Sequence, residues 1–172
     1  MDCIEAINRR RSIRKFKNID IGKENLDILL NAAQAAPSAG NMQGRDFIIV
    51  TDRTIKRELV IAAHNQHFIA SAPIIIVAVA NIRRSSTRYG QRGELYAVQD
   101  ATASVMNIML AATDIGLGTC WIGAFDEEMV KDILNIPINE RPVAMVPIGY
   151  PDENPIMPQR MSLDQIVHRE RW

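Results

Sequence analysis

The stretch from Leu95 to Gly123, which reads LYAVQDATASVMNIMLAATDIGLGTCWIG, constrains the fold more than any other part of the chain. On a helical wheel, Asp100, Ser104, Asn107 and Asp114 fall on one narrow polar stripe, and a broad arc of alanine, valine, isoleucine and methionine lies beside it. A surface helix needs only one apolar face. The pattern therefore predicts a long helix that is buried on most sides.

Two further features of this segment concern what lies next to the helix. Its many small residues would let another helix approach closely, and its apolar arc is wider than one contact requires, so we expect a second subunit to cover part of it. Gly116 suits the left-handed residue that ends many helices. After it, Cys120 to Phe125 is expected to form a strand, and the glycine-edged part up to Gly123 can turn backbone N–H groups toward a ligand.

Composition narrows the class of protein. A chain of 172 residues with 47% hydrophobic and 23% charged residues is typical of one soluble domain, here residues 1–172. Basic and acidic residues balance at 20 each, which gives no overall attraction to nucleic acid or to an anionic membrane. The longest apolar run, Ile74 to Ala80, is far shorter than the roughly 20 residues of a membrane span. Cys3 and Cys120 form no Cys-x-x-Cys pair and no signal peptide is visible, which favours a cytoplasmic protein.

Periodicity and capping residues predict the other elements, which are mixed helices and strands. The expected helices cover 2–8, 23–35 (with Leu26, Ile28, Leu29 and Ala33 inward), 53–63 after the cap Asp52, 127–134 after Asp126, and a short one opened by the capping box Ser162 to Gln165. The expected strands are 46–51, 74–80 and 142–150.

The segment from Arg9 to Phe16 (RRRSIRKF) carries five cations in seven positions and a hydroxyl group. Because alternate side chains of an extended segment share a face, Arg10, Ser12 and Arg14 would point together toward one ligand. Arginine presents a planar fork that matches phosphate oxygens, and serine adds a short donor. A solvated basic patch or a nucleic-acid contact is the alternative that the residues alone leave open.

Residues 37–44 (PSAGNMQG) are turn formers that carry hydroxyl and amide groups. The amides of Asn41 and Gln43 offer a donor and an acceptor together, and they could bind the carbonyl and imide edges of a heterocycle. An Asx turn that only shapes the backbone is the alternative.

Two more polar segments are candidates for ligand contacts. His64 and His67 lie three residues apart, but no third ligand with supporting spacing occurs, so we expect no metal and favour an amide of Asn65 or Gln66 at a pocket edge. The segment from Asn81 to Gly93 (NIRRSSTRYGQRG) is expected to be an exposed loop. As an alternative it could be a lid over an anionic substrate.

Four of these motifs follow one another along the chain in a defined order and spacing. They are Arg10-Arg11-Ser12-x-Arg14, Pro37-Ser38-x-x-Asn41-x-Gln43, Gly116 to Gly123 (GLGTCWIG), and PIGYP followed by Arg160. In this set and spacing, around an apolar central helix, the sequence resembles the FMN-dependent nitroreductase family over nearly its whole length. The resemblance makes a cofactor site the favoured interpretation of the N-terminal basic run.

The resemblance implies an α+β fold, with a mostly antiparallel central sheet flanked by helices around a long buried helix. It implies an intimate homodimer with one FMN in each of two interface clefts. Carried over to this sequence, the contacts are Arg10, Arg11, Ser12 and Arg160 at the phosphate and ribityl chain, Arg14 at the pyrimidine edge, Pro37, Ser38 and Asn41 from the other subunit, an amide of Asn65 or Gln66, and the backbone of Ile122 and Gly123 at N5 and O4.

The implied activity is hydride transfer from NAD(P)H through FMN to an electron-poor acceptor of the nitroaromatic or quinone type, by a ping-pong mechanism. A guanidinium near N1 and O2 stabilises the negative charge that reduction places there. No side chain is expected to act as a nucleophile or general acid, because the cofactor carries the chemistry. The alternatives are a flavin-binding protein without turnover, for storage or sensing, and a specialised branch such as a dehalogenase or flavin-fragmenting enzyme.

Two departures from the family pattern affect the active-site cleft. Members often have proline and an aromatic residue after the glutamine that corresponds to Gln43, whereas Gly44 and Arg45 follow here. Longer members also carry extra helices that roof the cleft, and only residues 83–93 are available for that purpose in this chain. An open cleft with a broad acceptor range is expected.

Overall fold

The sheet has four strands, and every neighbouring pair is antiparallel. In the computed structural model, which describes all residues 1–172, the strand order is β1-β2-β4-β3. The strands are β1 (Arg45–Val50), β2 (Ile74–Ala80), β3 (Gly118–Thr119) and β4 (Arg141–Gly149). The predicted α+β class with a mostly antiparallel sheet is confirmed.

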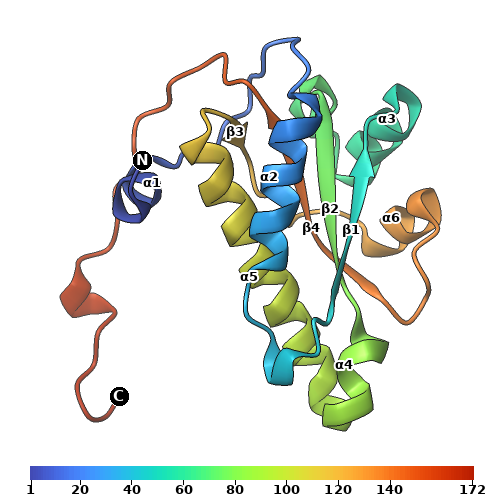
Figure 1. Cartoon of the computed structure of the whole chain (residues 1–172), viewed down its shortest axis with the longest axis vertical. Coiled ribbons are helices and arrows are strands. Elements are labelled where there is room, and N and C mark those ends of the chain that lie inside the picture. The colour runs from blue at the N-terminus through green and yellow to red at the C-terminus, as the bar shows by residue number, and fades with distance from the viewer.

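Helices cover both faces of the sheet (Figure 1). They are α1 (Cys3–Arg9), α2 (Gly22–Gln34), α3 (Arg53–Ala62), α4 (Ile82–Tyr89), α5 (Gly93–Asp114) and α6 (Glu127–Leu134). One buried cluster joins α2 and α5 to the sheet through Ile76 of β2, and another joins α3 and α6 to it through Ile75 and Val77. Because successive residues of a strand point to opposite faces, β2 is buried along its whole length between these two clusters.

The central helix α5 has the predicted character. Its buried residues include Ala101, Val105, Ile108 and the polar Asp100. The helix ends where expected: Gly116 has a φ of +80°, and Leu117 donates its backbone N–H to the carbonyl of Ala112 at 2.7 Å.

The segment from Asn81 to Gly93 is a correction to the sequence analysis, because it is helical and not an exposed loop. The side chain of Asn81 accepts the backbone N–H of Arg84 and caps α4, which packs on α5. Ser85 faces this contact and is fully buried. A serine at the helix contact gives no apolar periodicity, so the sequence pattern missed the helix.

Three smaller expectations also differ from the structure. The strand predicted for Cys120 to Phe125 is reduced to a single bridge between Ile122 and Met145, and the paired residues precede it as β3. Ile28 is 39% exposed, because it lies on the outer side of α2. Ser162 opens only a 3₁₀ turn at Leu163–Gln165, which has no buried residue to hold a longer helix in place.

The last twenty or so residues form an arm that leaves the sheet, passes α1 and continues away from the rest of the chain (Figure 1). The arm exposes a set of large apolar side chains: Ile156, Met157, Met161, Leu163, Ile166, Val167 and Trp172. None of the helices is long and apolar enough to cross a membrane.

Candidate functional site

A basic cavity of about 400 Å³ lies between the N-terminal segment and the C-terminal arm. It is lined by Arg10, Arg11, Ser12, Arg14, Pro155, Ile156, Pro158 and Arg160. None of its four arginines takes part in an ion pair within the chain. The cavity therefore concentrates positive charge that no carboxylate neutralises.

The extended segment that carries the arginines is held against the end of the sheet. Ser12 pairs with Thr119 of β3 as a parallel bridge, and Ile13 donates its backbone N–H to the Thr119 carbonyl at 2.8 Å. The buried side chains of Ile13 and Phe16 pack with Ala72 on the inner side. Ser12 and Arg14, which flank the buried Ile13, both line the cavity, as alternation in an extended segment predicts for these two residues.

Arg11 also lines the cavity, although strict alternation would turn it away from Arg10 and Ser12. Its guanidinium donates to the carbonyls of Asn8, at 2.6 Å, and Arg10, at 2.8 Å. These bonds follow the end of α1, where the chain passes from helix to extended backbone, so Arg11 braces that corner.

The C-terminal arm is fixed to the same segment before it reaches Arg160. The carboxylate of Glu153 accepts the backbone N–H groups of Arg14 and Lys15, and Asp152 donates its N–H to the Lys15 carbonyl at 2.9 Å. The arm is thus tied down seven residues before Arg160. This attachment brings Arg160 to the arginines at the other end of the sequence.

Cys120 is a neighbour of the cavity that the sequence analysis did not single out. Its thiol is buried, and burial raises its pKa above the ordinary value, while the charge of Arg14 and a hydrogen bond with Ser12 act in the opposite direction. The contact follows from the pairing of Ser12 with Thr119, which no local pattern announces.

The backbone after Cys120 offers one free donor. Ile122 uses both of its backbone groups on Met145, at 2.9 and 3.0 Å, whereas the N–H of the exposed Gly123 has no hydrogen-bond partner within the chain. Gln66 lies beside this turn and donates to the carbonyl of Ala124 at 3.2 Å. Of the two residues predicted to face a flavin with their backbone, Gly123 is the one with an available N–H.

Pro37, Ser38 and Asn41 lie far from the basic cavity within one chain. Their loop is bonded to Asp100 in the first half of α5, and the cavity adjoins Thr119, which follows the other end of that helix (Figure 1). One chain therefore does not bring these three residues to the arginines. The family resemblance implies that they come from a second subunit.

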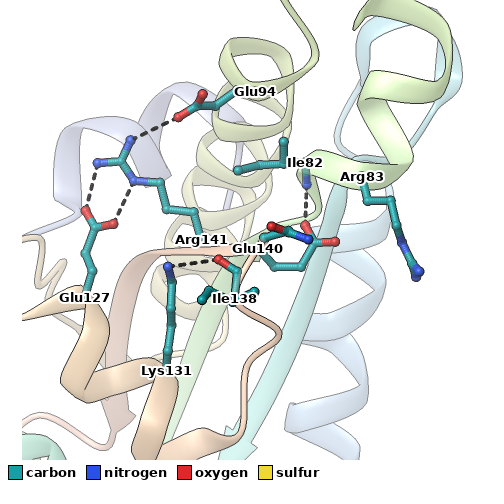
Figure 2. Close-up of a pocket in the computed structure, with 9 residues that line it drawn as sticks. Ile82, Arg83, Glu94, Glu127, Lys131, Ile138, Glu140 and Arg141 are labelled. Atoms are coloured by element: carbon teal, nitrogen blue, oxygen red, sulfur yellow. Dashed lines mark hydrogen bonds and ion pairs between the residues drawn. The ribbon is translucent and has the colours of Figure 1, made fainter. Parts of the chain in front are cut away.

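The largest hollow, about 630 Å³, lies elsewhere and has a different character (Figure 2). Arg141 there makes a two-bond ion pair with Glu127 at 2.8 and 2.9 Å and approaches Glu94 at 3.8 Å. Glu140 accepts the first N–H of α4, from Ile82. These interactions link β4, α4, α5 and α6 to one another. Because the charges pair with groups of the chain itself, the hollow offers little to an anion.

Comparison with known proteins gives a consistent result. The model of the nitroreductase family matches residues 7–66 and 56–150. A protein of Archaeoglobus fulgidus, provisionally named an NADH dehydrogenase/NAD(P)H nitroreductase, is 35% identical over 99% of this chain and 99% of its own. An FMN reductase (NADPH) of Bacillus subtilis is 28% identical over 99% of this chain and 74% of its own. The solved NADPH:FMN oxidoreductase of Vibrio harveyi, complexed with NAD+, superposes with a TM-score of 0.92 at 29% identity, over 99% of this chain and 77% of that chain.

Proposed function

The chain belongs to the nitroreductase family, and we propose that it is a one-domain FMN-dependent oxidoreductase that transfers hydride from NAD(P)H to an electron-poor acceptor. Relatives named NAD(P)H nitroreductase, FMN reductase and NADPH-flavin oxidoreductase have NAD(P)H-dependent reduction in common, and the last two names also include a flavin. The observation that carries the proposal is the cavity with Ser12 and four unpaired arginines.

The residues of the cavity fit the phosphate end of FMN. A phosphate dianion needs cationic donors, and Arg10, Arg11 and Arg160 supply guanidinium groups there. The hydroxyl of Ser12 adds a short donor between them. No carboxylate lines the cavity, and the nearby carboxylate of Glu153 accepts the backbone N–H groups of Arg14 and Lys15.

Arg14 and Gly123 are proposed to act at the ring end. When bound, FMN supplies a ring that accepts hydride from NAD(P)H and passes it to the second substrate. Arg14 would stabilise negative charge at the N1 and O2 edge, and the free N–H of Gly123 would donate at N5 or O4. Gln66 contributes by fixing the turn that carries Gly123.

A homodimer would complete the site. Pro37, Ser38 and Asn41 belong to a loop beside the first half of α5, whereas the basic cavity lies near the end of that helix. A second subunit is therefore required if they are to reach the same cofactor. The apolar side chains exposed on the C-terminal arm and on α1, where Ile4 is 66% exposed, support such an interface.

The helical packing of α4 on α5 bears on the substrates. Residues 82–89 form a helix packed on α5, so this segment is not the loop that could act as a lid. An open cleft suits a ping-pong mechanism, in which NAD(P)H leaves before a nitroaromatic or quinone acceptor occupies the same space.

The test is the visible absorption spectrum of the purified protein before and after anaerobic NADPH. Flavin absorbance that bleaches, and then returns when a quinone is added, is expected. Arg10→Ala should lose flavin, whereas Arg83→Ala, at the unrelated charged hollow, should retain it. Bound flavin that NADPH and NADH leave oxidised would favour storage or sensing, and protein that takes up no FMN would overturn the proposal.

A further inference from the structure

We propose that Asp100 is a positioning residue: its buried carboxylate fixes the loop Ala39–Gly44, and so places Ser38 and Asn41 against the cofactor of a second subunit. This inference rests on the proposed function. Asp100 belongs to α5 and has no direct part in the basic cavity of its own chain. It would act through the loop.

The carboxylate holds both ends of the loop at once. Oδ1 accepts the backbone N–H of Ala39 and Oδ2 that of Gly44, each at 3.0 Å, and Asp100 is only 4% exposed. Gly44 approaches α5 so closely that an added Cβ would lie 3.2 Å from Oδ2 and 3.3 Å from Cα of Ala97. The glycine that departs from the family pattern is therefore the residue that lets the loop reach the carboxylate.

The loop needs such an external support because its own backbone is strained. Gln43 has a φ of 52°, in the left-handed region that residues with a side chain rarely adopt, whereas Gly40 and Asn41, at 52° and 57°, are residue types that tolerate this region. Ser38 closes the loop internally by accepting the N–H of Gln43 on its hydroxyl oxygen at 3.0 Å. That bond leaves the hydroxyl hydrogen of Ser38 free to donate outward.

Arg45 fixes the beginning of the 36–44 segment through backbone carbonyls. Its side chain is 6% exposed, and one guanidinium nitrogen donates to the carbonyls of Gln34 and Ala36 at 2.9 Å each. Arg45 and Asp100 thus brace the two flanks of the 36–44 segment from inside the protein. A buried carboxylate that receives two backbone N–H groups prefers one arrangement, because a misplaced loop would leave its charge unsatisfied.

Two variants disturb the contact from opposite sides. Asp100→Asn keeps the shape of the side chain but replaces one acceptor by an NH₂ group that faces a backbone N–H. Gly44→Ala keeps the carboxylate and pushes the loop away from it. Val130→Ala is the control for general destabilisation, because Val130 is fully buried on α6, on the opposite face of the sheet.

The experiment compares the FMN dissociation constant, the rate of anaerobic reduction by NADPH, and hydrogen exchange of the Ala39 and Gly44 amides. Both variants should lose amide protection at Ala39 or Gly44 and bind FMN about 10- to 100-fold more weakly, whereas Val130→Ala should lower the melting temperature and leave FMN affinity unchanged. Retained protection in Asp100→Asn, or lost protection with unchanged FMN affinity and reduction rate, would overturn the positioning role. A wild-type chain that takes up no FMN overturns the proposed function and with it the role toward the cofactor, whatever the amides show.

Discussion

The backbone N–H of Ile13 donates to the carbonyl of Thr119 at 2.8 Å, and this bond joins the arginine segment to the strand that follows the central helix. The two residues are more than a hundred positions apart. Through this bond the position of Arg10, Ser12 and Arg14 depends on how α5 ends. Changes at that end should therefore be felt in the cavity.

Gly118→Ala tests this dependence. An added Cβ would lie 2.7 Å from Cγ1 and 2.9 Å from Cβ of Ile13, so the arginine segment must shift. We expect a loss of about 1–3 kcal/mol in the free energy of unfolding and weaker FMN binding, measured by urea unfolding and flavin fluorescence. Gly116→Ala is the control: it meets no atom within 4 Å but has a φ of +80°, so it should lose stability and keep FMN affinity. Equal affinity in both variants would contradict the prediction.

Arg14→Ala should weaken FMN binding or slow its reduction by NADPH, because it removes the guanidinium that we propose to lie at the pyrimidine edge. Arg14→Lys keeps the charge but loses the planar fork, so it should fall between the alanine variant and the wild type. Stopped-flow bleaching of the flavin measures the rate. If affinity and rate both stay at wild-type values in Arg14→Ala, the placement of this side chain is wrong.

Arg160→Ala should weaken FMN binding about tenfold, because it removes one of the charged donors that we propose for the phosphate. The loss should shrink as salt is added, since the arginine is exposed. Arg169→Ala, further along the same arm and outside the cavity, is the matched control. Titrations at two ionic strengths measure the effect, and equal affinities of the two variants would contradict it.

Cys120 should be the unreactive thiol of the pair. Cys3 is exposed and should react rapidly with Ellman's reagent, whereas the buried Cys120 should react only on unfolding. Burial raises the pKa of the folded Cys120 thiol, so the stability it contributes is present below the ordinary thiol pKa and declines as the pH rises through that range. Urea unfolding from pH 7 to 10 should show a smaller decline in Cys120→Ala, and two rapidly reacting thiols would refute the assignment.

Leu29→Ala should cost about 2–5 kcal/mol in the free energy of unfolding, because Leu29 is fully buried between α2 and the sheet. Ile28→Ala, next to it, should cost about 0.5 kcal/mol or less, since Ile28 is on the outer side of the helix. Urea unfolding of the two alanine variants measures both free energies. A large loss at Ile28 would instead indicate that a second subunit covers it.

The sequence predicted best what rests on periodicity and capping. The buried strand Ile74 to Ala80, the caps Asp52 and Asp126 and the left-handed Gly116 were all confirmed, because each depends on residues close in sequence. The helix α4 was missed because its buried residue is Ser85 and the segment carries no apolar repeat.

The candidate site was only partly accessible to the same reasoning. Alternation in an extended segment turned Ser12 and Arg14 to one side, but Arg160 is far away in sequence and was reached through the family resemblance alone. The structural roles of Gly44 and Arg45 could not be predicted from the sequence either. Only the folded chain shows that Gly44 makes room for Asp100 and that Arg45 binds the carbonyls after α2.

The cavity draws its arginines from both ends of the sequence, and this has a consequence for synthesis on the ribosome. Arg10 to Arg14 emerge first, but the wall that holds Arg160 can close only after β4 and the tether at Glu153 have been made. The four arginines of the cavity therefore come together only after the strands of the sheet have been made. A ribosome-bound chain can form much of the sheet while the basic cavity still lacks the wall that residues 155–160 provide.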